Sequence, residues 1–149
     1  MKRPHMIAGG FLALALVVQF VPVDRSNPPE TAVLALPADI APLIERACID
    51  CHSHRTRWPW YGWVAPVSWL LRSDVREARR EMNFSTWGEM ARKDQQAAMM
   101  SIRRRVKKGE MPLPKYLWMH PEAVLTDAER QRIQAWALGR AEELGKQAD

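Results

Sequence analysis

The sequence predicts an all-α fold. Apolar residues recur at the three- and four-residue spacing of a helix in several segments, most clearly in residues 68–82. No segment shows the apolar–polar alternation of a half-buried strand. The run Thr126-Asp127-Ala128-Glu129 is a capping box, a side-chain pattern that starts many helices. Together these observations favour a helical domain.

Four helices are expected beyond residue 37. Their ranges are residues 38–48, 68–82 and 94–108, with a last helix from Thr126 onward. Ser68 is a suitable N-cap for the second helix, and Gly109 ends the third after a run of cations. Gly139 either ends the last helix early or lies within it.

The composition limits the function classes. A length of 149 residues allows one domain plus an anchor or a tail. The 22 Lys and Arg residues against 17 Asp and Glu give a formal charge of +5. Because Lys2 and Arg3 lie ahead of an apolar run, the rest of the chain has an excess of only three cations. This small excess does not indicate a nucleic-acid partner.

The N-terminus reads as a signal peptide or a signal-anchor helix, assigned to residues 1–23. The apolar run Met6–Val21 has sixteen residues, about 24 Å of helix, against a hydrocarbon core of about 30 Å. Extending the helix from Pro4 to Val23 closes that gap. The one A-x-A pattern near the N-terminus, at residues 13–15, lies inside the run, so an uncleaved transmembrane anchor with its basic end in the cytoplasm is expected. A cleaved signal peptide is the alternative.

A tether and a single domain are expected to follow. Residues 24–37 contain three prolines, which favours an extended tether that holds the rest of the chain off the membrane. Residues 38–149 would form the domain.

The only two cysteines of the chain lie in the run Cys48-Ile49-Asp50-Cys51-His52. This is the C-x-x-C-H pattern of covalent haem attachment. Two intervening residues put both thiols within reach of one porphyrin edge, where each forms a thioether with a vinyl group. His52 then lies under the porphyrin face as the proximal iron ligand. The pattern predicts one covalent haem c, and covalent attachment implies an export compartment such as the bacterial periplasm.

Three other uses of the cysteines are weaker. A redox pair is typical of a βαβ surround, which the sequence does not contain. A zinc site needs four ligands, and Cys48, Cys51, His54 and His120 would have to supply them without a second cysteine pair. A disulfide across two residues would stabilise little.

The segment after the motif is expected to wrap the haem. Between His54 and Pro66, two prolines, a glycine and three tryptophans exclude a regular helix. The candidate haem contacts and propionate donors are Arg55, Arg57, Trp58, Trp60, Trp63 and Pro66. The carbonyl of Ala65 or Pro66 is the expected acceptor for the Nδ1–H of His52. An aromatic minicore is the other reading of this segment.

Met111 is the candidate for the distal iron ligand. It lies on a proline-locked loop, Glu110-Met111-Pro112-Leu113-Pro114, after the third helix. His120 is the rival ligand, with Met119 beside it, and Met111 as core filler remains an alternative.

The chain resembles the bacterial haem-binding-domain family of small membrane-anchored c-type haem proteins over residues 19–136. Matching runs include Thr56-Arg57-Trp58-Pro59-Trp60-Tyr61, Asn83-Phe84-Ser85-Thr86-Trp87 and Gly109-Glu110-Met111-Pro112-Leu113, besides Cys48–Ser53. The resemblance implies a cytochrome c-like domain of about four helices wrapped on a haem held by Cys48, Cys51 and His52. Similarity to cytochromes c implies Met111 as the sixth ligand.

The expected function is one-electron transfer at the bacterial inner membrane, with the haem domain facing the periplasm. A redox protein with an acidic surface, or a membrane respiratory complex, is the expected partner. It would dock on Arg72, Arg76, Arg79 and Arg80, although a solvated helix face is the simpler reading of these arginines. A peroxidase-like enzyme, a redox or ligand sensor and a haem subunit of a larger complex are the alternatives.

Overall fold

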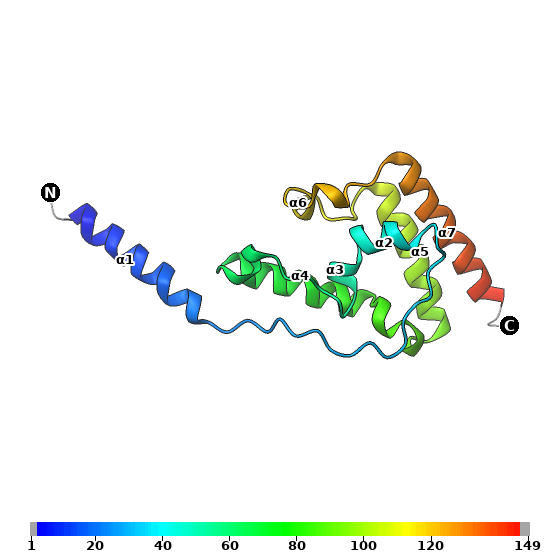
Figure 1. Ribbon diagram of the computed structural model, residues 1–149, viewed down its shortest axis with the longest axis horizontal. Coiled ribbons are helices and arrows are strands. Elements are labelled where there is room, and N and C mark those ends of the chain that lie inside the picture. The colour runs from blue at the N-terminus through cyan, green and yellow to red at the C-terminus, as the bar shows by residue number, and fades with distance from the viewer. Residues whose placement is uncertain (1–2, 147–149) are drawn as a thin grey trace.

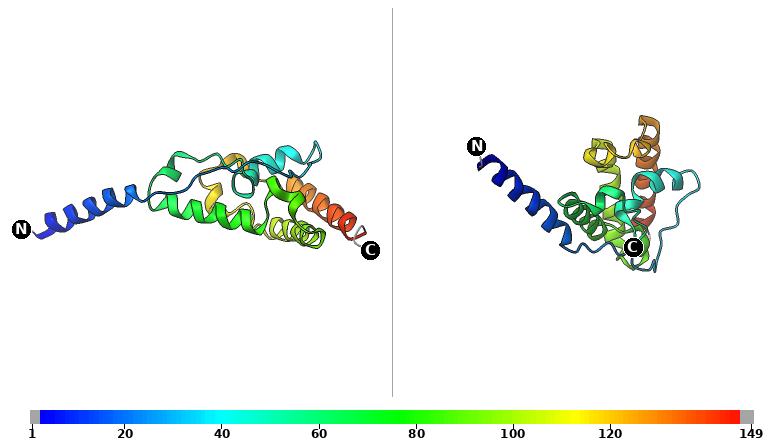
Figure 2. Two further views of the ribbon diagram at one scale, coloured as in Figure 1. Left: turned by 90° about the horizontal axis from the view of Figure 1, so that it is seen from below. Right: turned by 60° about the vertical axis from the view of Figure 1, so that its left-hand side comes forward.

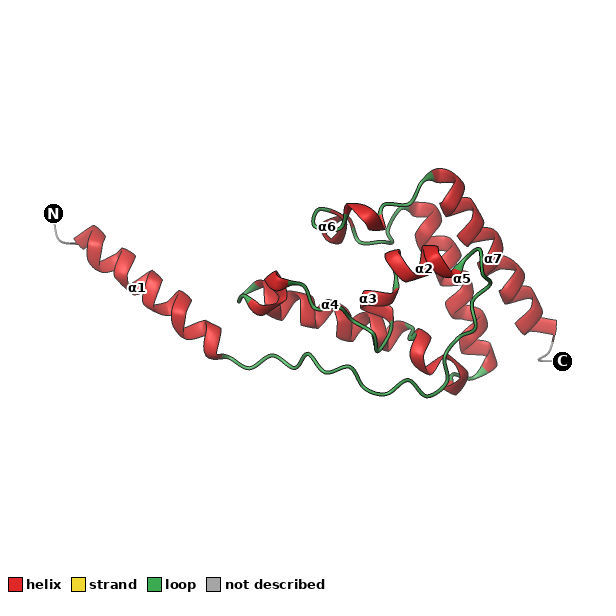
Figure 3. Ribbon diagram, viewed as in Figure 1, coloured by secondary structure: helices red, strands yellow, loops and turns green. Residues whose placement is uncertain are grey.

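The computed structural model describes residues 3–146, and the side chains from Met6 onward. The described chain is all-helical and contains no strand, which confirms the all-α prediction (Figure 3). The helices are α1 Arg3–Val17, α2 Ala41–Ala47, α3 Ile49–His52, α4 Val67–Glu81, α5 Arg92–Lys108, α6 Pro114–Leu117 and α7 Asp127–Lys146. Short 3-10 helices lie at η1 Val18–Phe20, η2 Trp60–Trp63, η3 Phe84–Glu89 and η4 Pro121–Ala123.

The core forms where α5 and α7 pack side by side and α2 lies across them (Figure 1). Its fully buried side chains include Ile44 of α2, Met99 of α5, and Ile133 and Ala137 of α7. With Ala47 of α2, Val106 of α5 and Ala141 of α7 they form one apolar stripe per helix, at helical spacing, and the stripes are buried against one another. The helix pair thus forms the main core of the domain.

Several helix boundaries differ from the predicted ones. The first helix begins at Ala41 and not at residue 38, and α5 begins two residues earlier than predicted, at Arg92. The first helix ends near Cys48 as predicted, but the backbone of Cys48 (φ −132°, ψ −38°) is followed by a further turn, α3, that was not expected. Ser68 does not cap α4, because the helix already begins at Val67 and Ser68 is buried inside its first turn. The predicted end of α5 is confirmed, since Gly109 adopts the left-handed conformation (φ 70°) that closes a helix without steric cost.

The segment 24–37 is extended, but it lies on the domain and does not stand free. The amide of Leu34 donates to the carbonyl of Phe84 (2.9 Å), and the Leu34 side chain is buried. Gly88 donates to the carbonyl of Ala32 (2.9 Å), and a Cβ at Gly88 would lie only 3.0 Å from the Ala32 Cβ, so a glycine permits this close approach. The segment therefore acts as a strap across η3.

The apolar α1 extends away from the domain (Figures 1 and 2). Within residues 3–146, none of the helices combines the length and the apolar character needed to cross a membrane, so the expected transmembrane helix is not supported. The expected orientation of the basic end involves Lys2 and the Arg3 side chain, which lie outside the described residues.

The capping box is confirmed at the start of α7. The Thr126 amide donates to Oε2 of Glu129 (2.8 Å), and the Glu129 amide donates to Oγ1 of Thr126 (3.3 Å). Glu129 also pairs with Arg46 of α2 (2.7 Å). The hydrogen bond from Arg46 and those from Thr126 hold the pKa of Glu129 at about 2, below its usual 4.5. The helix continues through Gly139 to Lys146.

This pairing predicts a pH dependence of stability. Because the folded pKa of Glu129 is depressed, its contribution is fully present above about pH 4.5 and is lost as the pH falls toward 2. Glu129→Gln should lower the urea midpoint at pH 7 and reduce its fall between pH 5 and pH 2.5. The matched control is Glu143→Gln, which removes an exposed pair with Arg140. If the urea midpoint falls as much in Glu129→Gln as in the wild type between pH 5 and pH 2.5, Glu129 is not the source of this pH dependence.

Candidate functional site

A cavity of about 620 Å³ lies between the α2–α3 corner, the second half of α4, α5 and the loop after α5. This volume falls in the usual range for small-molecule and cofactor sites. Its apolar wall includes Ile44, Ala47, Ala78, Met82, Phe84, Met90, Ala98, Ile102, Val106, Met111, Pro112 and Leu113. Its polar wall includes Cys48, Asp50, Cys51, His52, Asp74, Glu77, Glu81, Asp94, Ser101, Arg105 and Tyr116.

One helical turn brings both thiols and the imidazole to the same wall. The amides of Cys51 and His52 both donate to the carbonyl of Cys48, at 3.2 and 2.9 Å. Burial raises the pKa of Cys48 to about 12, and the nearby Cys51 adds to this shift. Burial also raises the pKa of Cys51 to about 12, with the negative charge of Asp50 adding to it. Both thiols are therefore held in the protonated form.

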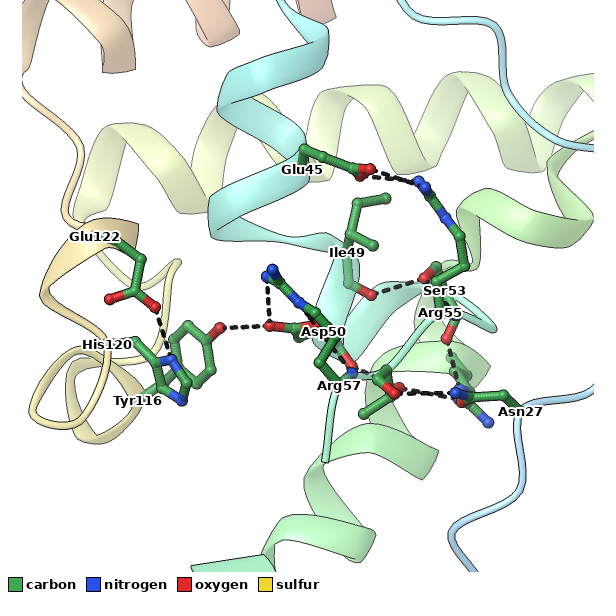
Figure 4. Close-up of polar contacts among 12 residues, drawn as sticks. Asn27, Glu45, Ile49, Asp50, Ser53, Arg55, Arg57, Tyr116, His120 and Glu122 are labelled. Carbon is green, nitrogen blue, oxygen red and sulfur yellow. Dashed lines mark hydrogen bonds and ion pairs between the residues drawn. The ribbon is translucent and has the colours of Figure 1, made fainter. Parts of the chain in front are cut away.

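Asp50 fixes the middle of this turn (Figure 4). Its carboxylate is buried and accepts from Nε and Nη2 of Arg57, at 3.0 and 3.1 Å. The hydroxyl of Tyr116 donates to the same carboxylate (3.0 Å). Thr56 adds a bond to the Asp50 carbonyl (2.7 Å). These bonds satisfy a buried charge and attach the motif to the loops on either side of it.

The orientation of His52 is set by the end of α4. Its Nδ1 lies 3.1 Å from the carbonyl oxygens of both Ala78 and Met82. Carbonyl oxygens only accept, so Nδ1 carries the proton and Nε2 presents a lone pair. Burial lowers the pKa of His52, which also favours the neutral ring. A neutral imidazole with a free Nε2 is the form that binds a metal.

The expected acceptors for this proton were wrong. The Ala65 carbonyl accepts instead from the Gln19 side chain (3.2 Å), and Pro66 lies outside the cavity wall. The Ala78 carbonyl also accepts from the Met82 amide (2.9 Å), so the imidazole uses its second lone pair, and the Met82 carbonyl lies just beyond the end of α4. The end of α4 thus offers acceptors that the sequence does not reveal.

Methionine sulfur is available on the same cavity wall. Met111 lies there on the loop that follows α5, half-buried beside Pro112 and Leu113. Met82 and Met90 also line the cavity, so the structure adds Met90 as a candidate that the sequence did not indicate.

Most of the predicted contacts from the segment after the motif lie elsewhere. Arg55, Arg57, Trp58, Trp60, Trp63 and Pro66 do not line the cavity. Arg55 pairs with Glu45 (2.8 Å), and Arg57 pairs with Asp50 (3.0 Å). Trp60 and Trp63 are 72% and 63% exposed. The segment turns away from the cavity because its polar groups bind the strap: the Asn27 side chain donates to the Thr56 carbonyl (2.9 Å) and the Pro29 carbonyl lies 2.8 Å from Nδ1 of His54.

His120 also lies outside the cavity. Its Nε2 is 2.7 Å from the Tyr61 hydroxyl, its Nδ1 is 2.9 Å from Glu122, and its ring stacks on Tyr116. His54 lies 2.8 Å from the Asn83 side chain as well as from the Pro29 carbonyl. The zinc alternative would need both imidazoles beside the thiols, so this geometry does not favour it.

Three of the four arginines expected to form a docking patch make ion pairs or hydrogen bonds with other residues of the chain. Arg72 pairs with Asp24 (2.8 Å) and Arg80 pairs with Glu77. Arg79 donates to the carbonyl of Ser53 (2.8 Å) and to Asn27 (2.7 Å). The cation on the cavity wall is instead Arg105 of α5, which the sequence placed among ordinary helix-end cations.

The comparison with protein families identifies the cofactor of the chain. The haem-binding domain model matches residues 13–138, which is most of the chain. The chain belongs to the haem-binding domain family. Its cofactor is haem. Neither a curated protein nor a solved structure matches the chain.

The residues of this haem-binding domain fit the cofactor. The wall is mostly apolar, as a porphyrin face requires, and one end carries two thiols beside a neutral imidazole. Arg105, which lies 4.0 Å from the Glu81 carboxylate, is the cation on the cavity wall that would pair with a propionate. The carboxylates of Asp74 and Glu77 are paired with Lys115 and Arg80. The donor set therefore matches a haem that is held through iron and through its edge.

The Tyr116 hydroxyl should stabilise the cysteine turn. Tyr116→Phe removes one bond to a buried carboxylate, so we expect about 1 kcal/mol less stability in urea unfolding. Amide hydrogen exchange at residues 50 and 51 should accelerate. Tyr61→Phe is the control, since its hydroxyl meets His120 and not the motif. Unchanged exchange in Tyr116→Phe would show that the bond does not hold the turn.

Proposed function

We propose that this haem-binding domain is a c-type cytochrome that carries single electrons at the periplasmic side of the bacterial inner membrane. The observation that carries the proposal is that Cys48, Cys51, His52 and Met111 line one cavity. A bound haem would supply one-electron iron chemistry there. Cys48 and Cys51 would hold it through two thioether bonds, and Nε2 of His52 would hold its iron.

The protein supplies orientation and exclusion of water. Two backbone carbonyls hold the Nδ1 proton of His52 and increase the electron donation of the ring. The apolar wall limits access of water and favours the less charged, reduced state of an iron site. A thioether from Met111, which lines the same cavity, would raise the reduction potential further. These features support electron transfer more than catalysis.

Export and membrane attachment are part of the proposal, and both are supported by the apolar α1. Covalent attachment of haem takes place outside the cytoplasm, so α1 would act as the export signal and remain as an anchor. A soluble or membrane-bound redox protein would be the partner. Intact mass of the protein from the membrane fraction tests the anchor. A mature chain that begins between residues 24 and 37, in the soluble periplasm, would contradict it.

Covalent attachment predicts that haem stays with the chain in acid acetone. Cys48→Ala with Cys51→Ala should lose it, because iron coordination alone does not survive acid. Each single variant is the matched control: it should retain haem through one thioether and show a red-shifted pyridine haemochrome. Loss of haem from the wild type under the same extraction would refute type c attachment.

Met111 as sixth ligand predicts a weak far-red charge-transfer band in the oxidised protein. Met111→Ala should abolish this band, lower the reduction potential and allow carbon monoxide to bind the reduced iron, since the thioether no longer occupies the site. Met90→Ala is the matched control, because it removes a thioether from the same cavity. If Met90→Ala abolishes the band and Met111→Ala preserves it, Met90 is the ligand.

A further inference from the structure

The exposed apolar surface of the domain is concentrated at one end. From residue 38 to residue 146, ten large apolar side chains are exposed, and eight of them lie in residues 60–70 and 118–119. They are Trp60, Trp63, Val64, Val67, Trp69, Leu70, Trp118 and Met119. Soluble surfaces scatter such residues singly, whereas a gathered patch marks an interaction site. We call this set of eight residues the tryptophan tip.

The two parts of the tryptophan tip are joined in space. The Tyr61 hydroxyl lies 2.7 Å from Nε2 of His120, which connects η2 to the segment that carries Trp118. The rings of Tyr61 and His120 also meet edge to face, with centroids 6.2 Å apart. The start of α4 contacts η2 directly. The tip is therefore a feature of one end of the fold.

The apolar helix α1 leaves the molecule from this same end (Figures 1 and 2). Gln19, just after α1, forms two hydrogen bonds with the backbone of Ala65, at 3.2 and 2.9 Å. Arg25 donates to the Gly62 carbonyl (2.9 Å) and places its guanidinium 4.1 Å from the centre of the Trp63 ring. Helix α1 and the tryptophan tip are thus held together at two points.

A lipid bilayer is the occupant that covers both surfaces. Large apolar side chains are exposed from Met6 to the end of α1, including Phe11, Leu14 and Val17, so this part of the helix needs an apolar surround on all sides. Tryptophan is enriched where a bilayer meets water, since its ring is apolar and its N–H is polar. A protein partner would have to match the tip and an entire apolar helix together.

We propose that the tryptophan tip rests in the headgroup region of the membrane, with α1 embedded beside it. This extends the membrane placement proposed above and does not depend on how haem is held. The cavity is lined by α4 residues from Asp74 onward, while the tip uses Val67 to Leu70. Ala78 lies eleven residues beyond Val67, about 16 Å along the helix axis. The cavity would face water while the tip faces lipid.

The experiment uses the full-length holoprotein in vesicles of phosphatidylcholine and phosphatidylglycerol. Leu70→Cys and Met119→Cys place a thiol at the tip, and Met100→Cys places one at an exposed apolar site of α5 as the matched control. We expect a charged, membrane-impermeant maleimide to modify the two tip thiols at least tenfold more slowly than the control thiol. Adding Trp60→Ser and Trp63→Ser should bring the Leu70→Cys rate close to that of the control.

Two results would overturn the proposal. Tip thiols that react as fast as the Met100→Cys thiol in vesicles would show that water covers the tip. Disulfide-linked dimers through Leu70→Cys would show that a second copy covers it. Failure of the haem proposal is visible separately, because unattached Cys48 and Cys51 would make the holoprotein without an added cysteine reactive toward maleimide after unfolding.

Discussion

The bond between His52 and the end of α4 is the interaction on which the site depends. Two carbonyls, from Ala78 and Met82, share the single proton on Nδ1 and so fix both the tautomer and the plane of the ring. They also lie at the negative end of a fifteen-residue helix, which favours a ring that gives electron density to a metal. The fold itself therefore sets the tautomer and the orientation of the imidazole. This contact and the bonds to Asp50 from Arg57 and Tyr116 hold α3, a single four-residue turn, from both of its sides.

A second set of hydrogen bonds holds α3 against α4. Arg79 donates to the carbonyl of Ser53 (2.8 Å), directly after the motif, and to the Asn27 side chain on the strap (2.7 Å). One guanidinium thus joins α4, the end of α3 and the N-terminal segment. Ser53 is fully buried and returns a bond to the Ile49 carbonyl (2.8 Å), so the turn is closed on its own side as well. The strap consequently belongs to the haem-binding domain, although its proline content reads as a tether.

Local chemistry could be predicted from the sequence, and long-range geometry could not. The capping box at Thr126, the glycine at the end of α5 and the placing of two thiols and an imidazole on one turn all depend on neighbours within five residues. The acceptors for His52 come from backbone atoms 26 and 30 residues away, and a carbonyl leaves no mark in a sequence. The sequence could not show which cation of residues 103–108 lies on the cavity wall, because this depends on which face of α5 packs against the rest of the fold. In the structure it is Arg105. The tryptophans of η2 were associated with haem because they follow the motif closely, yet their exposure associates them with a different surface.

Helix α4 connects the haem cavity with the tryptophan tip. Its first turns carry Val67 and Leu70 into an apolar tip, and its last turns supply the acceptors for His52 and part of the cavity wall. A helix is stiff over this length, so the distance between the tip and the cavity is set by residue count and not by a flexible linker. The Gln19 and Arg25 contacts then fix the direction of α1 relative to the same helix. For the electron transfer and membrane placement proposed above, this layout would keep the haem at a constant height above the membrane and accessible to a partner that arrives through water.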